Sequence, residues 1–519
     1  MKLKNIFSFA ILFIAALFMQ SCSDNDNVAA TGLTITNDGV AIESLDMPLG
    51  ETSVMLGVNT DADWTVSVPD ADTTWLSVTP HEGYGWNISD STASNYRSYF
   101  KVTTKKNVEA PRTSSITVTA GGLTKVITVN QTGITGDNDG HESAWQMVEN
   151  FVLGYNLGNM MESNPYGSWW GDGSKKTVEE WETAWGQPQL TKATVQALKA
   201  KGFNVLRVPI TWYPHIAKFS KTYTKDEDYT IDAAWMARVK EIVKMINEEG
   251  MYCIVNIQHD AGANNGSGDP NSAWLHADDD YDNVTKIYQA IWKQIATELK
   301  DYDDKVIFES FNEILNKNSS WTAPSAGNVA YESISKLQQD FVNVVRATGG
   351  NNEFRNLLIT TYGDTGNSEV AVNALTVPTD RHPHHICATF HSYDPYWFCN
   401  GNRHHEGESA SEKKEIDDNM KYYIYDFGTD QKAEIDQIFN RIDKKCGALG
   451  IPYFFGEFGA IGDHPEMTER AKYADYITSK CNEYKTAALW WMGLLNRSTN
   501  KWIDDEAPIV DALVKNRVK

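Results

Sequence analysis

The stretch Val306-Ile307-Phe308-Glu309-Ser310-Phe311-Asn312-Glu313 is an apolar run with high β-propensity that ends in two polar side chains. A buried strand has no packing reason to carry Asn312 and Glu313 at its end. Parallel α/β barrels keep their catalytic groups at the carboxyl-terminal ends of their strands. The stretch therefore predicts a barrel strand with Glu313 at its tip, and a second strand should carry a partner carboxylate.

Residues 144–519 alternate between strand-like apolar runs and amphipathic helical stretches. The expected strands are Phe151–Leu157, Asn204–Ile210, Tyr252–Ile257, Val306–Phe311, Asn356–Thr361, Ile386–Phe390, Pro452–Phe455 and Ala487–Trp491. The expected helices include Thr191–Lys201, Ile231–Glu249, Val284–Asp301, Ala330–Ala347, Gln431–Leu449 and Met467–Glu483. This order predicts an α/β fold, a closed (β/α)8 TIM barrel. A doubly wound open sheet is the alternative, but it would carry a glycine-rich phosphate turn after its first strand.

Residues 32–133 are rich in Thr, Val and Ser and show short alternating runs separated by turn residues. The clearest runs are Ser53–Val58, Trp64–Val68, Ser115–Thr119 and Lys125–Val129. They predict a small all-β sandwich of immunoglobulin type in front of the barrel. Residues 134–143 form a polar linker rich in Gly and Asp.

Residues 1–21 have the pattern of a cleaved signal segment, because the apolar run Ile6–Phe18 is shorter than the roughly 20 residues of a membrane-spanning helix. Its end resembles a bacterial lipoprotein signal, which implies that Cys22 is lipidated and that residues 22–31 form a tether. Asp24 and Asp26 resemble the acidic tag of lipoproteins on the outer cell surface. We therefore expect a protein anchored by lipid to the outer membrane of a bacterium, facing outward.

The composition narrows the partners. A net charge of −23 argues against nucleic acid and against an anionic membrane surface. The 17 Trp and 23 Tyr residues suit either core packing or a cleft in which sugar rings stack on aromatic faces. His382, His384 and His385 have no matching ligands elsewhere, so no metal site is expected. The remaining cysteines should be free, buried thiols: Cys253, Cys387, Cys399, Cys446 and Cys481.

Polar side chains gather at the expected strand ends, which meet on one face of a parallel barrel. They are Arg207, His259, Asn312, Glu313, His391, Tyr393, Glu457, Trp490 and Trp491. Glu313 and Glu457 would face each other across a cleft rich in aromatic residues. This is the arrangement that glycoside hydrolysis requires, with one carboxyl group as acid and the other as base or nucleophile.

The barrel resembles glycoside hydrolase family 5, subfamily 4. The motifs that carry the resemblance are Leu153–Asn159, Glu182–Gly186, Gly202–Trp212, Phe311–Glu313, His391–Tyr396 and Gly456–Gly459. The segment before the barrel resembles a BACON-type domain through Trp64, Trp75–Pro80, Asn107, Arg112 and Val126–Gln131. The first resemblance implies a retaining endo-β-1,4-glucanase without metal or organic cofactor. The second implies a module that acts as a glycan binder or, as we favour, a spacer.

The family resemblance also implies roles for single residues. Glu313 is the expected acid/base and Glu457 the expected nucleophile, with carboxyl groups about 5–5.5 Å apart and Glu313 protonated in the free enzyme. Trp491 is expected to lie under the reacting sugar ring, with Trp490 as the alternative. Glu309 should support the site from the barrel interior. The other substrate-binding or supporting residues are expected to be Arg207, His259, Asn312, His391, Tyr393, Trp274 and Asn159.

Two positions depart from the family pattern: Gln258 stands where a histidine is usual, and Met492 where an acidic residue is common. The expected substrate is a plant β-glucan, namely xyloglucan, mixed-linkage glucan or a cellulose-like chain, cleaved by a monomer. An endo-β-1,4-mannanase is the alternative within the class. A non-catalytic glycan-binding lipoprotein is the alternative outside it, and it predicts the loss of a catalytic carboxylate. Aromatic residues that could line the cleft are Trp169, Trp170, Trp212, Trp274, Tyr396 and Trp397.

Overall fold

The computed structural model describes residues 29–85, 98–107, 110–133, 140–165, 177–263, 269 and 271–516. They form two compact units, of which the first contains most of the strands before residue 130 and the second contains the barrel. The expected signal segment with Cys22, most of the expected linker, and Trp169 and Trp170 lie outside the described residues. Within the described ranges, no helix combines the length and the apolar content needed to cross a membrane.

The N-terminal unit is the expected all-β domain, with two antiparallel-paired sheets in the orders β2-β1-β4-β8-β6 and β3-β10-β9-β5-β7. Alternate side chains are buried along its strands, as in Trp64–Ser67, and the Trp64 ring packs on Phe100 inside. The strands are β1 Leu33–Asn37, β2 Val40–Ala41, β3 Ser44–Met47, β4 Thr52–Thr60, β5 Trp64–Ser67, β6 Leu76–Thr79, β7 Glu82–Gly83, β8 Ser98–Thr104, β9 Arg112–Ala120 and β10 Leu123–Gln131.

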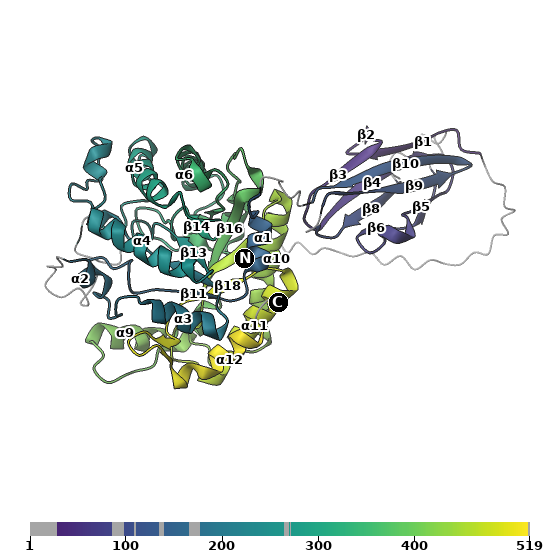
Figure 1. Ribbon diagram of the computed structural model, residues 1–519. Coiled ribbons are helices and arrows are strands. Elements are labelled where there is room, and N and C mark those ends of the chain that lie inside the picture. The colour runs from purple at the N-terminus through teal and green to yellow at the C-terminus, as the bar shows by residue number, and fades with distance from the viewer. Residues whose placement is uncertain are drawn as a thin grey trace, which may run out of the picture. The chain divides into compact units, whose positions relative to one another are not determined.

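The second unit confirms the (β/α)8 barrel, because β11 to β18 pair in parallel in chain order and β18 closes on β11 (Figure 1). The strands are β11 Gly154–Asn156, β12 Val205–Val208, β13 Tyr252–Val255, β14 Val306–Glu309, β15 Leu357–Ile359, β16 Ile386–Ser392, β17 Tyr453–Phe458 and β18 Ala488–Trp490. A small hairpin, β19 Leu495–Asn496 and β20 Lys501–Trp502, follows the last of them.

Helices surround the barrel. They are α1 Ala144–Asn150, α2 Val178–Glu182, α3 Lys192–Lys201, α4 Ala233–Glu248, α5 Tyr281–Leu299, α6 Val329–Ala347, α7 Glu369–Ala374, α8 Tyr396–Cys399, α9 Ala410–Asn419, α10 Thr429–Leu449, α11 Met467–Tyr484 and α12 Ala507–Lys515. The long helices match their sequence patterns to within a few residues, and α3 and α10 end at Gly202 and Gly450 in the left-handed conformation. The short α7, after strand β15, was not foreseen.

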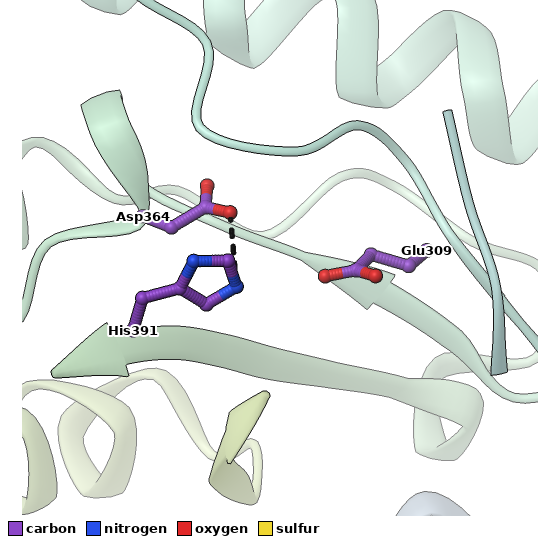
Figure 2. A group of neighbouring side chains, drawn as sticks. All are labelled: Glu309, Asp364 and His391. Carbon is purple, nitrogen blue, oxygen red and sulfur yellow. Dashed lines mark ion pairs between the residues drawn. The ribbon is translucent and has the colours of Figure 1, made fainter. Parts of the chain in front are cut away.

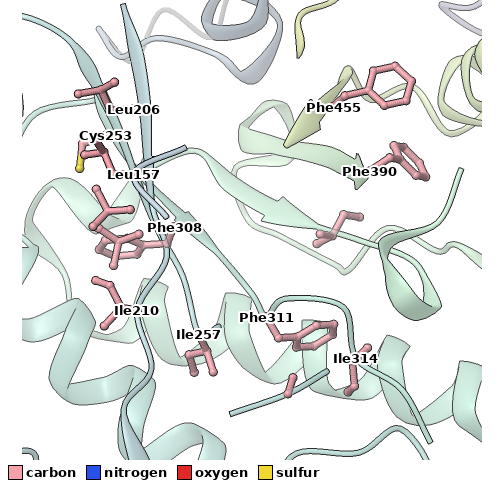
Figure 3. Close-up of a cluster of buried hydrophobic side chains, with 14 of the residues drawn as sticks. Leu157, Leu206, Ile210, Cys253, Ile257, Phe308, Phe311, Ile314, Phe390 and Phe455 are labelled. Atoms are coloured by element: carbon pink, nitrogen blue, oxygen red, sulfur yellow. The ribbon is translucent and has the colours of Figure 1, made fainter. Parts of the chain in front are cut away.

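Strand parity divides the core into two parts. Outward-facing side chains such as Leu206, Cys253 and Phe308 pack beneath the helices (Figure 3). Inward-facing side chains such as Val205, Ile254 and Ile307 fill the end of the barrel where the strands begin, together with residues of α1. Two positions further along a strand the inward side chain is polar, as in Arg207 after Val205 and Glu309 after Ile307. The barrel is therefore apolar at the end where its strands begin and polar where they end.

The carboxyl-terminal end of every barrel strand differs from the sequence prediction by one to three residues, and three of these differences lie at the polar end of the barrel near the two glutamates. β14 ends at Glu309 rather than Phe311, whereas β16 extends to Ser392 and β17 to Phe458. The early end of β14 has a physical reason, because the Asn312 N–H donates to the Ile257 carbonyl and the chain turns out of the sheet. Strict alternation would place Asn312 and Glu313 on opposite faces, and this turn removes that constraint. The five cysteines are buried and free, as expected.

Arg355 anchors the start of β14. Its guanidinium is completely buried, and Nε donates to the Asn352 side chain at 2.5 Å. The other nitrogens donate to backbone carbonyls at the end of α5, in the following turn and at the start of the strand: Leu299, Tyr302, Asp303 and Val306. Because buried carbonyl groups need a hydrogen-bond donor from the protein, the arginine holds the start of the strand that leads to Glu313.

We predict that Arg355→Met lowers the free energy of unfolding of the barrel by about 3 kcal/mol or more, because it leaves several buried carbonyls without donors. Urea unfolding followed by tryptophan fluorescence measures this change. Arg381→Met is the matched control, since half of that side chain is exposed and its ion pair with Glu353 lies at the surface. The control should cost less than about 1 kcal/mol. Equal losses in the two variants would contradict the anchoring role.

Candidate active site

Arg207 lies at the centre of the polar end of the barrel and is completely buried. Nε donates to Glu309 at 2.7 Å, and Nη1 donates to Glu457 at 2.6 Å. The remaining N–H groups donate to side-chain oxygens of Asn156 at 3.1 Å, Asn312 at 2.8 Å and Gln258 at 3.3 Å. The five N–H donors of a guanidinium are thus all used, which a lysine could not reproduce.

Glu457 sits on β17 at a point where the pairing with both neighbouring strands shifts register. Such a shift re-aims side chains at a strand end and brings Glu457 opposite His391. One carboxylate oxygen accepts from Arg207, and the other accepts from the Tyr393 hydroxyl at 2.7 Å. Burial raises the pKa of Glu457, while Arg207 and Tyr393 are among the groups that oppose the rise. These two donors favour the ionised form.

Glu313 follows β14 in the left-handed conformation, with φ of 46°. Its backbone N–H donates to Asp364 Oδ2 at 2.9 Å, which holds this uncommon conformation. Oε1 lies 2.9 Å from His391 Nδ1, and Oε2 accepts from the Asn312 amide at 3.3 Å. Burial raises the pKa of Glu313 to about 7, with Arg207 opposing. No arginine or lysine of the described residues pairs with it directly.

The two carboxyl groups are close. Oxygen atoms of Glu313 and Glu457 and a ring nitrogen of His391 all lie within 4.8 Å of one another. His391 Nδ1 is between the two, 2.9 Å from Glu313 and 3.7 Å from Glu457. Burial lowers the pKa of His391 to about 4, so the ring is neutral at pH 7. One protonated and one ionised carboxyl group can therefore share a small, water-poor site.

The two consecutive tryptophans, Trp490 and Trp491, differ in burial and in contacts. Trp490 is 1% exposed, packs edge-on against Phe458 and donates to the Met492 carbonyl at 3.2 Å. Trp491 is partly exposed, and Gly158 leaves room for it because a Cβ there would lie 2.9 Å from the indole. Trp491 is therefore the tryptophan that borders the open end of the barrel. A pocket of about 240 Å³ beside it is lined by Ile461 and Met492 among others.

Trp274 supports the site from below rather than lining it. It is 2% exposed, and its indole N–H donates to Asp260 at 2.7 Å. Asp260 also accepts from the backbone N–H groups of Trp212 and Tyr213, so it ties the loops after β12 and β13 together. Trp212 is likewise buried, whereas Tyr396 is 57% exposed.

The structure places the remaining expected residues as follows. Asn159 is partly exposed in a left-handed turn, with φ of 58°, and its N–H bonds to buried Glu162. The His259 ring lies 5.5 Å from that of Trp185, and burial lowers the pKa of His259 to about 4. Asn312 is part of the Arg207 network, as is Gln258 at the position where a histidine is usual.

Two residues of this network were missed in the sequence. Asn156 on β11 accepts from Arg207 and donates to the Gly456 carbonyl at 2.9 Å, which links both sides of the barrel closure. Asp364 follows β15 and contacts both Glu313 and His391. The rule that polar residues collect at strand ends could have found Asp364, since it stands five residues beyond Ile359.

Two groups of side chains in the described residues have metal-ligand geometry: Glu309 with Asp364 and His391, and Glu313 with His391 and Glu457. One Glu309 oxygen already pairs with Arg207, as does one of Glu457. A cation bound in either group would stand close to that guanidinium, an unfavourable arrangement. The expectation that the site works without a metal or organic cofactor stays a prediction.

The sequence profile described as Cellulase (glycosyl hydrolase family 5) matches residues 170–493, which is more than half of the chain. The chain belongs to glycoside hydrolase family 5. It is therefore a glycoside hydrolase, and Glu313 and Glu457 bring together the two carboxyl groups that this chemistry uses. The profile BACON, described as a putative N-terminal binding domain, matches residues 62–132.

Relatives of this family 5 chain include two curated proteins. The Cellulase/esterase CelE of Acetivibrio thermocellus is 31% identical over 72% of this chain, which spans 40% of that protein. The Xyloglucan-specific endo-beta-1,4-glucanase BoGH5A of Bacteroides ovatus is 26% identical over 93% of this chain and 90% of its own length. A crystal structure of the family 5 enzyme PbGH5A from Prevotella bryantii, in complex with a xyloglucan tetradecasaccharide, is 33% identical, with a TM-score of 0.60, over 72% of this chain and 99% of its own.

We predict that Tyr393→Phe lowers kcat about 10- to 100-fold and moves the acidic limb of the pH profile to higher pH. The hydroxyl stabilises ionised Glu457, so its removal raises the pKa of that carboxyl group, and more protons are bound at a given acidic pH. Tyr476→Phe is the control, because Tyr476 donates to Asp436 at 2.8 Å from helix α11, outside the barrel. A pH profile of kcat/KM that is the same for both variants and the unchanged enzyme would contradict the assignment.

Proposed function

We propose that the protein is a retaining endo-β-1,4-glucanase of subfamily 4 that hydrolyses the backbone of a plant β-glucan. The observation that carries the proposal is the unequal pairing of two neighbouring carboxyl groups. Glu457 accepts hydrogen bonds from Arg207 and Tyr393, whereas Glu313 faces a neutral histidine. Such a difference separates the pKa values of two carboxyl groups and defines a nucleophile and an acid.

In the proposed first step, ionised Glu457 attacks the anomeric carbon while Glu313 transfers its proton to the leaving glycosidic oxygen. One oxygen atom of each group lies within 4.8 Å of the other, which fits the short carboxyl separation of a retaining pair, about 5–5.5 Å, better than the about 6.5–9.5 Å of an inverting pair. The pKa of Glu313 near 7 suits an acid at neutral pH.

In the second step, the ester formed by Glu457 carries no charge, and this lowers the pKa of Glu313. Ionised Glu313 then accepts a proton from water as the water attacks the anomeric carbon and releases Glu457. Arg207 holds the side-chain oxygen of Asn312, so the Asn312 amide nitrogen faces away from it. One N–H of this nitrogen donates to Glu313, and the other is left for a sugar hydroxyl. Trp491 offers an aromatic face beside the reacting ring.

The substrate is inferred from the relatives. BoGH5A, named for xyloglucan, aligns with nearly the whole chain, and PbGH5A was crystallised with a xyloglucan oligosaccharide. We therefore favour xyloglucan, with mixed-linkage glucan and cellulose-like chains as further substrates. A mannanase is the alternative. A non-catalytic glycan-binding protein is disfavoured, because both carboxyl groups and their partners are intact.

A substrate panel tests the proposal. The unchanged protein should release reducing ends from xyloglucan, mixed-linkage glucan and soluble cellulose and few from mannan. The rate of this release should be lower by at least about 10³-fold in Glu457→Ala. Glu142→Gln is the control, because that carboxyl group bonds Tyr252 and Asn150 away from the site. No release from any polysaccharide by the unchanged protein would refute the proposed function.

Azide separates the two roles on an aryl β-glycoside with a good leaving group. In Glu457→Ala, azide should attack the anomeric carbon in place of the missing carboxylate and give the α-glycosyl azide. In Glu313→Ala it should attack the ester of Glu457 and give the β-glycosyl azide. The opposite pairing of products would exchange the two assignments.

We also propose that the chain is a surface lipoprotein anchored to the outer membrane through Cys22, with the BACON-type domain as a spacer. The lipoprotein-like end of the signal segment supports this proposal. In a bacterial host that processes lipoproteins, the unchanged protein should partition into the detergent phase, and Cys22→Ser should remain in the aqueous phase. A Cys22→Ser protein that stays with the membrane would contradict the anchor.

A further inference from the structure

Asp364 is a completely buried carboxyl group next to the proposed acid/base. Figure 2 shows it facing the His391 ring, and one oxygen of Asp364, one oxygen of Glu309 and a ring nitrogen of His391 lie within 4.8 Å of one another. Asp364 Oδ2 accepts the backbone N–H of Glu313 at 2.9 Å and lies 3.4 Å from His391 Nε2. Neither His391 Nε2 nor Asp364 Oδ1 has a hydrogen-bond partner among the described residues. A buried ring nitrogen without a partner is costly, so this contact requires an explanation.

Charge balance shows which form Asp364 takes. Four carboxyl groups gather around Arg207 and His391, namely Glu309, Glu313, Asp364 and Glu457, and only the first and last pair directly with Arg207. No lysine or arginine of the described residues pairs with Asp364. Burial and the charges of Glu309 and Glu313 raise the pKa of Asp364 well above its usual range.

We propose that Asp364 is a positioning residue that acts as a neutral carboxylic acid. Its O–H donates to His391 Nε2, so the single N–H of the neutral imidazole is on Nδ1 and faces Glu313 Oε1. The inference rests on Glu313 as the acid/base, and it adds the group that sets the tautomer of the histidine beside it. No proton moves along this chain during the reaction.

The tautomer decides where Glu313 carries its proton. With N–H on Nδ1, Oε1 of Glu313 is an acceptor, and the acidic proton is placed on Oε2, free to reach the glycosidic oxygen. Once that proton has left, the same N–H stabilises the carboxylate until it takes a proton from water. With N–H on Nε2, the unprotonated Nδ1 would accept a hydrogen bond from the Glu313 hydroxyl. The acidic proton would then point away from the substrate.

Asp364 also holds the backbone of Glu313, which has a positive φ that non-glycine residues rarely adopt. A single carboxyl group therefore controls both the position of the acid/base and the direction of its proton. This double role explains why Asp364 itself lies in a left-handed turn, with φ of 52°, after β15.

The test compares two substitutions at Asp364. Asp364→Asn has a single atom at the position of Oδ2, so it can accept the Glu313 N–H or donate to His391 Nε2 but not both, and it should lose about 10-fold in kcat/KM on β-glucan. Asp364→Leu has a similar size but neither group, and it should lose about 10²-fold or more. Thermal unfolding shows whether each variant is folded.

The tautomer is read directly. In protein labelled with ¹⁵N-histidine, the long-range ¹H–¹⁵N spectrum distinguishes protonated from bare ring nitrogens, and His391→Asn identifies the signals. The unchanged protein should show Nδ1 protonated, and Asp364→Leu, which offers no donor to Nε2, should lose this preference. Nε2 protonated in the unchanged protein would overturn the inference. Because this spectrum needs no substrate, it stands apart from the proposed function, which fails if the unchanged protein cleaves no glucan.

Two other results would overturn the inference. Full activity of a folded Asp364→Leu would mean that Asp364 positions neither Glu313 nor His391. Loss of activity of the unchanged protein on treatment with a chelator, restored by a divalent cation, would mean that Glu309, Asp364 and His391 bind a metal ion. Partial recovery of activity in Asp364→Asn relative to Asp364→Leu, without any effect of the chelator, supports the neutral acid.

Discussion

The polar end of this barrel depends on one buried positive charge. Arg207 is completely buried, and its five N–H groups donate hydrogen bonds to Glu309, Glu457 and three amide oxygens. A guanidinium cannot lose its proton in a protein, so it fixes the negative charge that the site can hold. Glu309 and Glu457 pair with it directly. Glu313 and Asp364 have no arginine or lysine partner among the described residues, and burial raises the pKa of both carboxyl groups.

This constraint turns four chemically similar side chains into groups with different tasks. In the proposed mechanism, Glu457 is ionised because it has two donors, and Glu313 is the acid because a neutral histidine faces it. The backbone sets the geometry that pairs Glu457 with Arg207 and leaves Glu313 without an arginine partner. The shifts in register around β17 aim Glu457, and the early end of β14 lets Asn312 and Glu313 reach the same site.

The sequence was sufficient for the barrel because its signals are periodic and local: apolar strands, amphipathic helices and glycine stops. It also located Arg207, Glu313 and Glu457, since a polar residue at a strand end conflicts with burial. The exact strand ends were less accessible, because a single backbone bond such as that from Asn312 to Ile257 decides them. Asp364 was missed for a related reason. Its position after a strand was a usable signal, but its contacts join the ends of three strands that lie far apart in the chain, and no local pattern encodes those contacts.

A buried cluster of this kind is weak evidence for stability. Removing several charged groups from water costs several kcal/mol each, and well-packed apolar residues in their place are often equally or more stable. The apolar half of the barrel, filled by residues such as Ile254, Ile307 and Leu358, shows that the fold can close on such side chains. The fold therefore gains nothing in stability that requires Arg207 and its partners. Their joint presence at the open end is best explained by the chemistry. That chemistry needs carboxyl groups with different pKa values, and water would screen the charges that produce the difference.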